Sequence, residues 1–276
     1  MQRRSIKKKK RSKKPLLFLL VVLVVAGGGI WYVIQPEKLS SPLSTDKKVP
    51  QTKAAIIEAP TGRTKMRTFS NEQFVTFYNT FAYPNTVEIT ELPPITGNAA
   101  ADIRIRSIAE KRGYKLRSVP ISSPEKLDEG FELQQKAVEP LLAMQAAAKK
   151  AGYTLSLTAA FRSVEYQRQL FVDRLSASAE AIAAGTADAA VNTTLERTAP
   201  PGYSRHHNGF TVDFSCGAVG GESFLATGCY EWLSKNNFEN AKNFGWIPSY
   251  PEGTHVTGPE PEAWEFVWVG RESLLE

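Results

Sequence analysis

The sequence contains little histidine and little cysteine, and both shortages limit where its chemistry can lie. Only three histidines occur in 276 residues, and all of them fall between positions 206 and 255. A site that uses imidazole must therefore lie in that part of the chain. The only cysteines are Cys216 and Cys229, so at most one disulfide can form within the chain.

Acidic residues are absent from the first 14 positions, which carry nine of the 34 lysines and arginines. The rest of the chain holds 25 basic against 28 acidic residues, so the folded part has no basic excess. Nucleic-acid binding proteins rely on such an excess. We therefore expect no nucleic-acid partner, and we interpret residues 1–14 as a cytoplasmic basic tail.

Charge is also missing from residues 15–34. As a helix this apolar run could cross a hydrocarbon core of about 30 Å, and the preceding basic tail predicts a cytoplasmic N-terminus. Small residues before Gly27 leave a cleavable signal peptide as the alternative, but the length of the run and the interfacial pair Trp31 and Tyr32 favour an uncleaved anchor. We expect a single-pass protein of the cell membrane whose C-terminal domain is extracytoplasmic.

Composition divides residues 35–276 into a linker and two structured parts. Residues 35–62 are rich in Pro, Ser, Thr and Lys without a sustained period, which is typical of a flexible linker. Residues 63–128 contain patterns for two helices, and we interpret them as a small helical element. Residues 129–276 form the main domain.

Local patterns predict several elements in the two structured parts. Ser70 opens a capping box ahead of aromatic residues at helical spacing, which we expect in a core. A second helix is expected from Asn98 to Gly113, burying Ile103 and Ile108. A third is expected from Pro140 to Gly152, followed by a strand over 153–158.

The segment SRHHNGFTVD, residues 204–213, places a histidine and an aspartate seven positions apart across Gly209. Val212-Asp213-Phe214 is predicted to be a short strand, where a carboxylate among apolar neighbours costs several kcal/mol unless it is paired or binds a metal. Gly209 allows the chain to turn so that His206 returns over Asp213. One imidazole and one carboxylate are two of the three protein ligands of a catalytic zinc ion.

This segment resembles the S-x-H-x-x-G-x-A-x-D signature of the VanY-type D-alanyl-D-alanine carboxypeptidases, zinc peptidases that share a fold with lysostaphin-like enzymes and the hedgehog signalling domain. The resemblance implies that His206 and Asp213 are zinc ligands, and Ser204 matches the serine of the motif. Thr211 stands where the pattern usually has alanine.

A second match lies upstream, where FRSVEYQRQLF is similar to the Y-R-S-x-x-x-Q-x-x-L-F segment of the family. Arg162 and Gln167 occupy the matching positions. The resemblance implies that Arg162 holds the terminal carboxylate of the substrate, for which a planar guanidinium is suited. The alternative is that Arg162 only forms a salt bridge with a neighbouring acid.

The closing segment is similar to the E-P-W-H-x-R-Y-V-G segment of the family but departs from it. Glu262 matches the general base, whereas Glu265 stands where the third zinc ligand is normally a histidine. Three outcomes are open: Glu265 is the third ligand, His207 or His255 replaces it, or the metal has been lost.

Cys216 and Cys229 are expected to form a disulfide, because thiols in an oxidising compartment pair readily. The alternative is that they ligate a metal. A bridge would close a loop behind Asp213 and stiffen the strand that bears it.

The sequence thus predicts an α+β fold in which a small antiparallel sheet with flanking helices carries a zinc site, preceded by one transmembrane helix. The resemblance implies hydrolysis of the terminal D-alanine of peptidoglycan stem peptides, with Glu262 as base, Arg162, Gln167 and Ser204 at the substrate, and His206, Asp213 and Glu265 at Zn²⁺. The alternatives are an inactive peptidoglycan-binding or scaffolding protein and an endopeptidase that cuts cross-bridges. The motifs do not separate D,D- from L,D-specificity.

Overall fold

The part of the chain that can be described begins at residue 65. The computed structural model describes residues 65–175, 178, 181–182, 184–251 and 258–276. The predicted basic tail, membrane helix and linker lie outside the described residues. Among the helices that are described, none is both long and apolar enough to cross a membrane.

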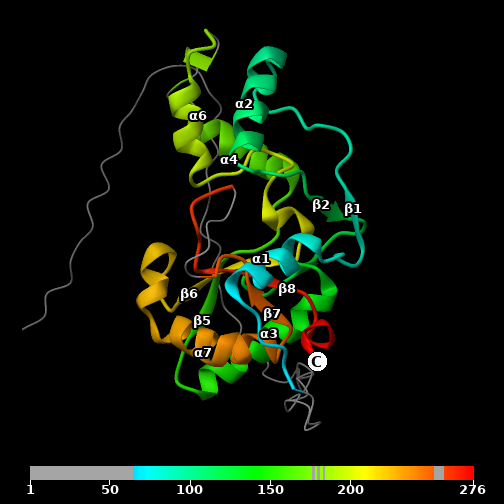
Figure 1. The fold of residues 1–276 in the computed structure, drawn as a ribbon, viewed down its shortest axis with the longest axis vertical. Coiled ribbons are helices and arrows are strands. Elements are labelled where there is room, and N and C mark those ends of the chain that lie inside the picture. The colour runs from blue at the N-terminus through cyan, green and yellow to red at the C-terminus, as the bar shows by residue number, and fades with distance from the viewer. Residues whose placement is uncertain (1–64, 176–177, 179–180, 183, 252–257) are drawn as a thin grey trace, which may run out of the picture. The chain divides into compact units, whose positions relative to one another are not determined.

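The largest sheet in the described part of the chain is antiparallel and has four strands (Figure 1). Its strands are β5 (Leu155–Ala159), β6 (Thr211–Cys216), β7 (Trp246–Pro248) and β8 (Glu265–Trp268), in the spatial order β5-β6-β8-β7. Strands β6 and β8 are therefore central and hydrogen-bonded on both sides. Nearly all of their residues are buried, as expected for central strands whose two faces are both covered.

Two further antiparallel pairs lie upstream of this sheet. Strand β1 (Thr86–Glu88) pairs with β2 (Ser118–Pro120), and β3 (Glu125–Lys126) pairs with β4 (Glu132–Leu133). All of the described strand pairs are antiparallel, so the expected α+β class with small antiparallel sheets is confirmed.

The helices are interspersed among the strands along the chain. They are α1 (Asn71–Thr80), α2 (Ala99–Lys111), α3 (Gln135–Lys150), α4 (Val164–Leu175), α6 (Asp188–Leu195) and α7 (Gly228–Lys242), with short 3₁₀ helices η2 (Arg205–Asn208), η3 (Gly221–Ala226) and η4 (Arg271–Leu274). The predicted capping box is present at α1: the Ser70 hydroxyl accepts from the Gln73 amide at 3.3 Å, and the Ser70 amide donates to the Gln73 side chain at 2.7 Å.

The buried apolar residues form two clusters. The first joins the four-stranded sheet to α1, α3 and α7, with Phe74, Leu141, Phe214, Trp246 and Phe266 at its centre. The second joins α2, α4 and α6, which Figure 1 shows grouped together, through Ile105, Phe171, Val191 and Leu195. Residues 65–128 contribute α1 to one cluster and α2 to the other, and they also supply β1, β2 and β3, so they are not solely helical.

Two local expectations were wrong. Ile103 is 67% exposed, and Ile105 occupies the buried position on α2 beside Ile108. Helix α3 begins five residues before Pro140, because burial of Ala137 and Val138 in the first cluster offsets the backbone hydrogen bond that an internal proline removes.

The expected disulfide is present. Cys216 at the end of β6 is bonded to Cys229 in the first turn of α7. Neither cysteine is therefore a metal ligand, and the bridge ties the end of the strand that carries Asp213 to a helix of the first cluster.

Candidate metal centre

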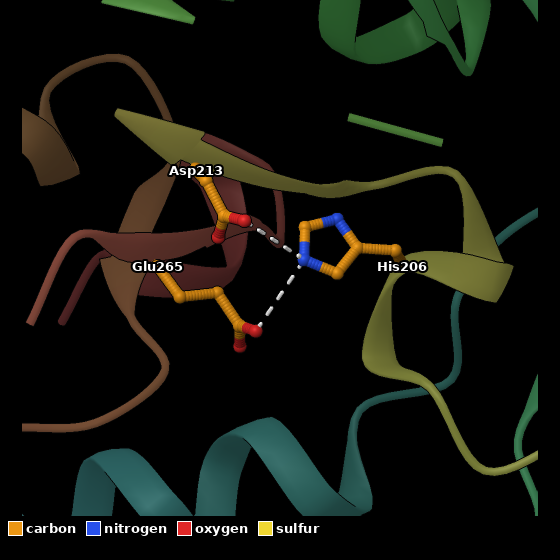
Figure 2. A group of neighbouring side chains, drawn as sticks. All are labelled: His206, Asp213 and Glu265. Carbon is orange, nitrogen blue, oxygen red and sulfur yellow. Dashed lines mark ion pairs between the residues drawn. The ribbon is translucent and has the colours of Figure 1, made fainter. Parts of the chain in front are cut away.

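Three buried side chains from three elements meet beside the sheet (Figure 2). His206 comes from η2, Asp213 from β6 and Glu265 from β8. His206 Nε2 lies 3.4 Å from Asp213 Oδ2 and 3.6 Å from Glu265 Oε2. One atom of each residue lies within 4.8 Å of the other two, so the group could hold a metal ion.

The register of the sheet brings the two carboxylates together. Asp213 and Glu265 are directly opposite in the antiparallel pair of β6 and β8. Like charges in that arrangement repel, and burial increases the cost. Gly209 has a φ of 74°, which ends η2 and turns the chain into β6, and this turn returns His206 over the strand. The arrangement is one that a bound cation would stabilise.

The hydrogen bond of His206 sets the ring in the form that binds metals. Its Nδ1 donates to the Ala160 carbonyl at 2.8 Å, so Nε2 carries the lone pair and faces the carboxylates. His206 Nε2, Asp213 Oδ1 and Glu265 Oε1 are buried and have no hydrogen-bond partner. Unsatisfied buried polar atoms are rare in native structures, and His206 Nε2 and Asp213 Oδ1, beside a Glu265 Oε1 that has only an ion pair at 3.5 Å, indicate a missing partner. Ligands about 2.0–2.2 Å from a tetrahedral zinc ion lie about 3.3–3.6 Å apart, so these residues fit zinc.

His207 is excluded as a ligand in this arrangement. It is fully buried, its Nδ1 donates to the Arg162 carbonyl at 2.7 Å, and its Nε2 accepts from the Gly202 amide at 3.0 Å. Both ring nitrogens are occupied, and burial lowers the pKa of His207 to about 4. His255 lies outside the described residues.

Glu265 has a cationic partner that the sequence did not reveal. The buried guanidinium of Arg205 lies 3.5 Å from Glu265 Oε1 and donates to the Ser249 carbonyl at 3.0 Å. It also lies over two aromatic rings, 4.4 Å from the centroid of Tyr78 and 3.9 Å from that of Tyr250. Arg205 therefore offsets the charge of the glutamate that stands where the family has a neutral histidine.

Arg162 is engaged at the same group. Its Nη2 donates to Asp213 Oδ2 at 3.1 Å, so Arg162 does form a salt bridge with a neighbouring acid. Burial raises the pKa of Asp213, but the His206 ring when it carries a second proton, together with Arg162, outweighs burial and holds the pKa of Asp213 below its usual range. One quarter of the Arg162 side chain stays exposed, so it can also contact a ligand.

The other predicted residues lie nearby. The Ser204 hydroxyl caps η2 by accepting from the His206 amide at 3.3 Å. Gln167 donates from Nε2 to the Ala199 carbonyl at 2.8 Å, and its Oε1 is buried without a partner. Burial, followed by the charges of Glu265 and Asp213, raises the pKa of Glu262 to about 9.

A pocket connects these residues to solvent. Its lining consists of Tyr114, Arg117, Arg162, Gln167, Arg197, Ala199, Tyr203, Ser204, Arg205, His206, Tyr250, Pro259, Glu262 and Glu265. Six of the predicted site residues are in it. Sequence reasoning missed the arginines at 117, 197 and 205 and the tyrosines, because no local spacing marks side chains that converge from separate loops. The only sequence feature that could have marked Arg205 as a site residue was its position between Ser204 and His206.

Comparison with known proteins identifies the family. The family model for VanY, D-alanyl-D-alanine carboxypeptidase, matches residues 130–271, and the chain therefore belongs to this family. YodJ of Bacillus subtilis strain 168, named as a candidate carboxypeptidase, is 29% identical over 159 residues, which cover 56% of this chain and 52% of YodJ. A D-alanyl-D-alanine carboxypeptidase of Enterococcus faecalis strain V583 is 29% identical over 134 residues, 47% of this chain and 46% of that protein. The chain thus spans about half the length of these relatives.

Solved structures resemble it more loosely. A mutant of the vancomycin-resistance D,D-pentapeptidase VanY in complex with Zn(II) is 26% identical, covering 58% of this chain and 83% of that one, with a TM-score of 0.43. The LD-carboxypeptidase LdcB is 27% identical, covering 56% and 67%, with a TM-score of 0.44.

Proposed function

We propose that this protein is a zinc-dependent carboxypeptidase that removes the terminal D-alanine from peptidoglycan stem peptides. The observation that carries the proposal is the buried group of His206, Asp213 and Glu265, in which His206 Nε2 lies 3.4 Å and 3.6 Å from one oxygen of each carboxylate, beside a pocket that also contains Glu262 and Arg162. Membership of the VanY family supports the reaction class.

Three residues of the chain hold the metal in this proposal. His206 is oriented by Ala160, and Asp213 and Glu265 are held by the register of β6 and β8. A zinc ion bound there supplies a Lewis acid that lowers the pKa of water and polarises a carbonyl. Arg205 reduces the net negative charge of the ligand set, which would otherwise weaken that acidity.

Glu262 is the general base. It lies in the pocket beside Glu265, where burial, followed by the charges of Glu265 and Asp213, raises its pKa to about 9. It takes a proton from the attacking water and delivers it to the departing amine. At that pKa the carboxyl would be protonated at neutral pH, and a divalent cation in the site would oppose the two neighbouring charges and lower the pKa, so that the carboxylate is available as a base.

Arg162, Gln167 and Ser204 orient the substrate. Arg162 is anchored at one nitrogen by Asp213, which fixes its planar guanidinium for the terminal carboxylate. Gln167 Oε1 is a buried acceptor without a partner, so a substrate N–H that reaches it would remove an unsatisfied group. Correct placement of the scissile bond by these contacts is worth a large part of the rate.

We propose further that the domain works outside the cytoplasm, anchored by residues 15–34. The bond between Cys216 and Cys229 supports this location, because structural disulfides persist in oxidising compartments.

The test is D-alanine release from stem peptides ending in D-alanine by the purified protein, with zinc and after chelation. We expect release that depends on zinc and falls about 10²- to 10⁴-fold in Glu262→Gln. Saturable peptide binding without release under any metal would favour a wall-binding protein instead. Cleavage of cross-bridges without D-alanine release would favour an endopeptidase.

A further inference from the structure

Residues 65–128 lie outside the match to the family, yet they form part of the pocket wall. Tyr114 and Arg117 both line the pocket, and neither falls within residues 130–271. The Tyr114 hydroxyl is used within the fold, because it donates to the Leu195 carbonyl at 2.5 Å. Arg117 has no comparable side-chain partner among the described residues.

The four arginines of the pocket differ in how they are paired. Three have a carboxylate partner: Arg162 with Asp213, Arg197 with Glu222, and Arg205 with Glu265. Within the described part of the chain, the guanidinium of Arg117 forms no salt bridge, and its Nε is buried without a hydrogen-bond partner. Arg117 is thus a cation in the pocket whose charge no carboxylate of the described residues offsets.

The position of Arg117 is nevertheless fixed. Its amide donates to the Gly202 carbonyl at 2.9 Å, and its carbonyl accepts from the Ile89 amide at 3.1 Å. Its guanidinium lies 5.6 Å from the centroid of the Tyr78 ring, the same ring against which Arg205 packs. A cation held in place before the ligand arrives loses little conformational entropy on binding.

The charge of the pocket defines the chemistry of its ligand. Four arginines and two glutamates line it, and a divalent cation would add to the positive side. In the proposed function, the guanidinium of Arg162 binds the terminal carboxylate of the substrate. We propose that Arg117 binds a second carboxylate, on a residue upstream of the released D-alanine, and so selects acidic peptides. This inference rests on the proposed function and extends it to the substrate class.

The experiment compares two peptides that end in D-alanine and differ only in one upstream side chain, which bears a free carboxylate in one and its amide in the other. The wild-type protein should prefer the acidic peptide. Arg117→Met should lower kcat/KM for the acidic peptide about 10- to 100-fold, mainly through KM, and leave the amidated peptide almost unchanged. Arg117→Lys should recover part of the preference.

Arg67→Met is the matched control. The Arg67 guanidinium also lies over aromatic rings, 4.9 Å from Phe69 and 5.8 Å from Phe77, but it does not line the pocket. This variant should keep the wild-type preference. Unchanged circular dichroism and zinc content in the Arg117 variants show that any effect arises at the pocket.

Equal use of both peptides by the wild type, or an equal loss for both in Arg117→Met, would overturn the role of Arg117. If the wild type releases no D-alanine from either peptide, the proposed function fails, and calorimetric binding of the same two peptides then decides the inference. A preference for the acidic peptide that Arg117→Met removes supports it, and equal binding refutes it.

Discussion

The strand side of the pocket and the side formed by residues 65–128 hold their functional groups by different means. On the strand side, Asp213 and Glu265 lie on central, buried strands in fixed register, and a disulfide ties the end of β6 to α7. On the other side, Arg117 is held by two backbone hydrogen bonds and one aromatic ring. The match to the family covers the first side and not the second. The comparison teaches that family membership informs the reaction and the residues at the scissile bond, whereas Arg117, to which we assign the choice of upstream residue, lies outside the region that the family model matches.

The largest effect is expected when the proposed base is removed and the metal ligands on the strand side are left intact. Glu262→Gln keeps the shape of the side chain but cannot accept a proton, so kcat should fall about 10²- to 10⁴-fold. Zinc content should be unchanged, because Glu262 is not one of the three grouped residues. Turnover and elemental analysis measure the two quantities, and wild-type turnover in this variant would remove Glu262 from the role of base.

The next largest effect is expected on stability, when the ion pair between Glu265 and Arg205 is broken. Arg205→Met leaves a buried carboxylate without its cation, so the metal-free protein should lose about 3–5 kcal/mol of stability. Zinc should restore much of that loss by replacing the missing positive charge. Thermal denaturation with and without zinc measures both, and an equal loss in the two states would contradict the charge compensation.

A double variant tests the same ion pair through metal affinity. Glu265→His restores the imidazole of the family pattern and should raise zinc affinity. The gain should be larger in combination with Arg205→Met, because the single variant leaves a buried guanidinium facing the new ring. Competition titration with a chelator gives the affinities. Identical affinities in wild type, single and double variants would show that residue 265 does not bind the metal.

The disulfide should affect stability more than chemistry. Replacing Cys216 and Cys229 together by serine should cost about 3 kcal/mol, the value expected for a closed loop of this size. Zinc content should persist, because neither cysteine is among the grouped residues. Denaturant unfolding provides the stability, and loss of zinc at full secondary structure would show that the bridge is needed to position Asp213.

Much of the fold could be predicted because its signals are local. The capping box at Ser70, the strand around Asp213 and the pairing of the only two cysteines each follow from a few adjacent residues or from composition. The errors arose where packing overrode a local rule. Pro140 lies inside α3, and Ile105 replaced Ile103 at the buried position.

The site was predictable only in part, for a related reason. His206 and Asp213 share one motif, but Glu265 joins them through strand register, which spacing alone does not give. Arg205 is recognisable as a partner of Glu265 only once Tyr78, Ser249 and Tyr250 surround it. Such contacts join segments far apart in the sequence, so no window of residues contains them.

The central claim is that His206, Asp213 and Glu265 bind zinc, and its most direct test is elemental analysis of the purified, zinc-reconstituted protein beside His206→Ala and His207→Asn. We predict about one zinc per chain in the wild type, its loss in His206→Ala, and its retention in His207→Asn, because both ring nitrogens of His207 are bonded to the backbone. A wild-type protein without zinc after reconstitution would contradict the claim, and the peptide-binding alternative would then replace the peptidase.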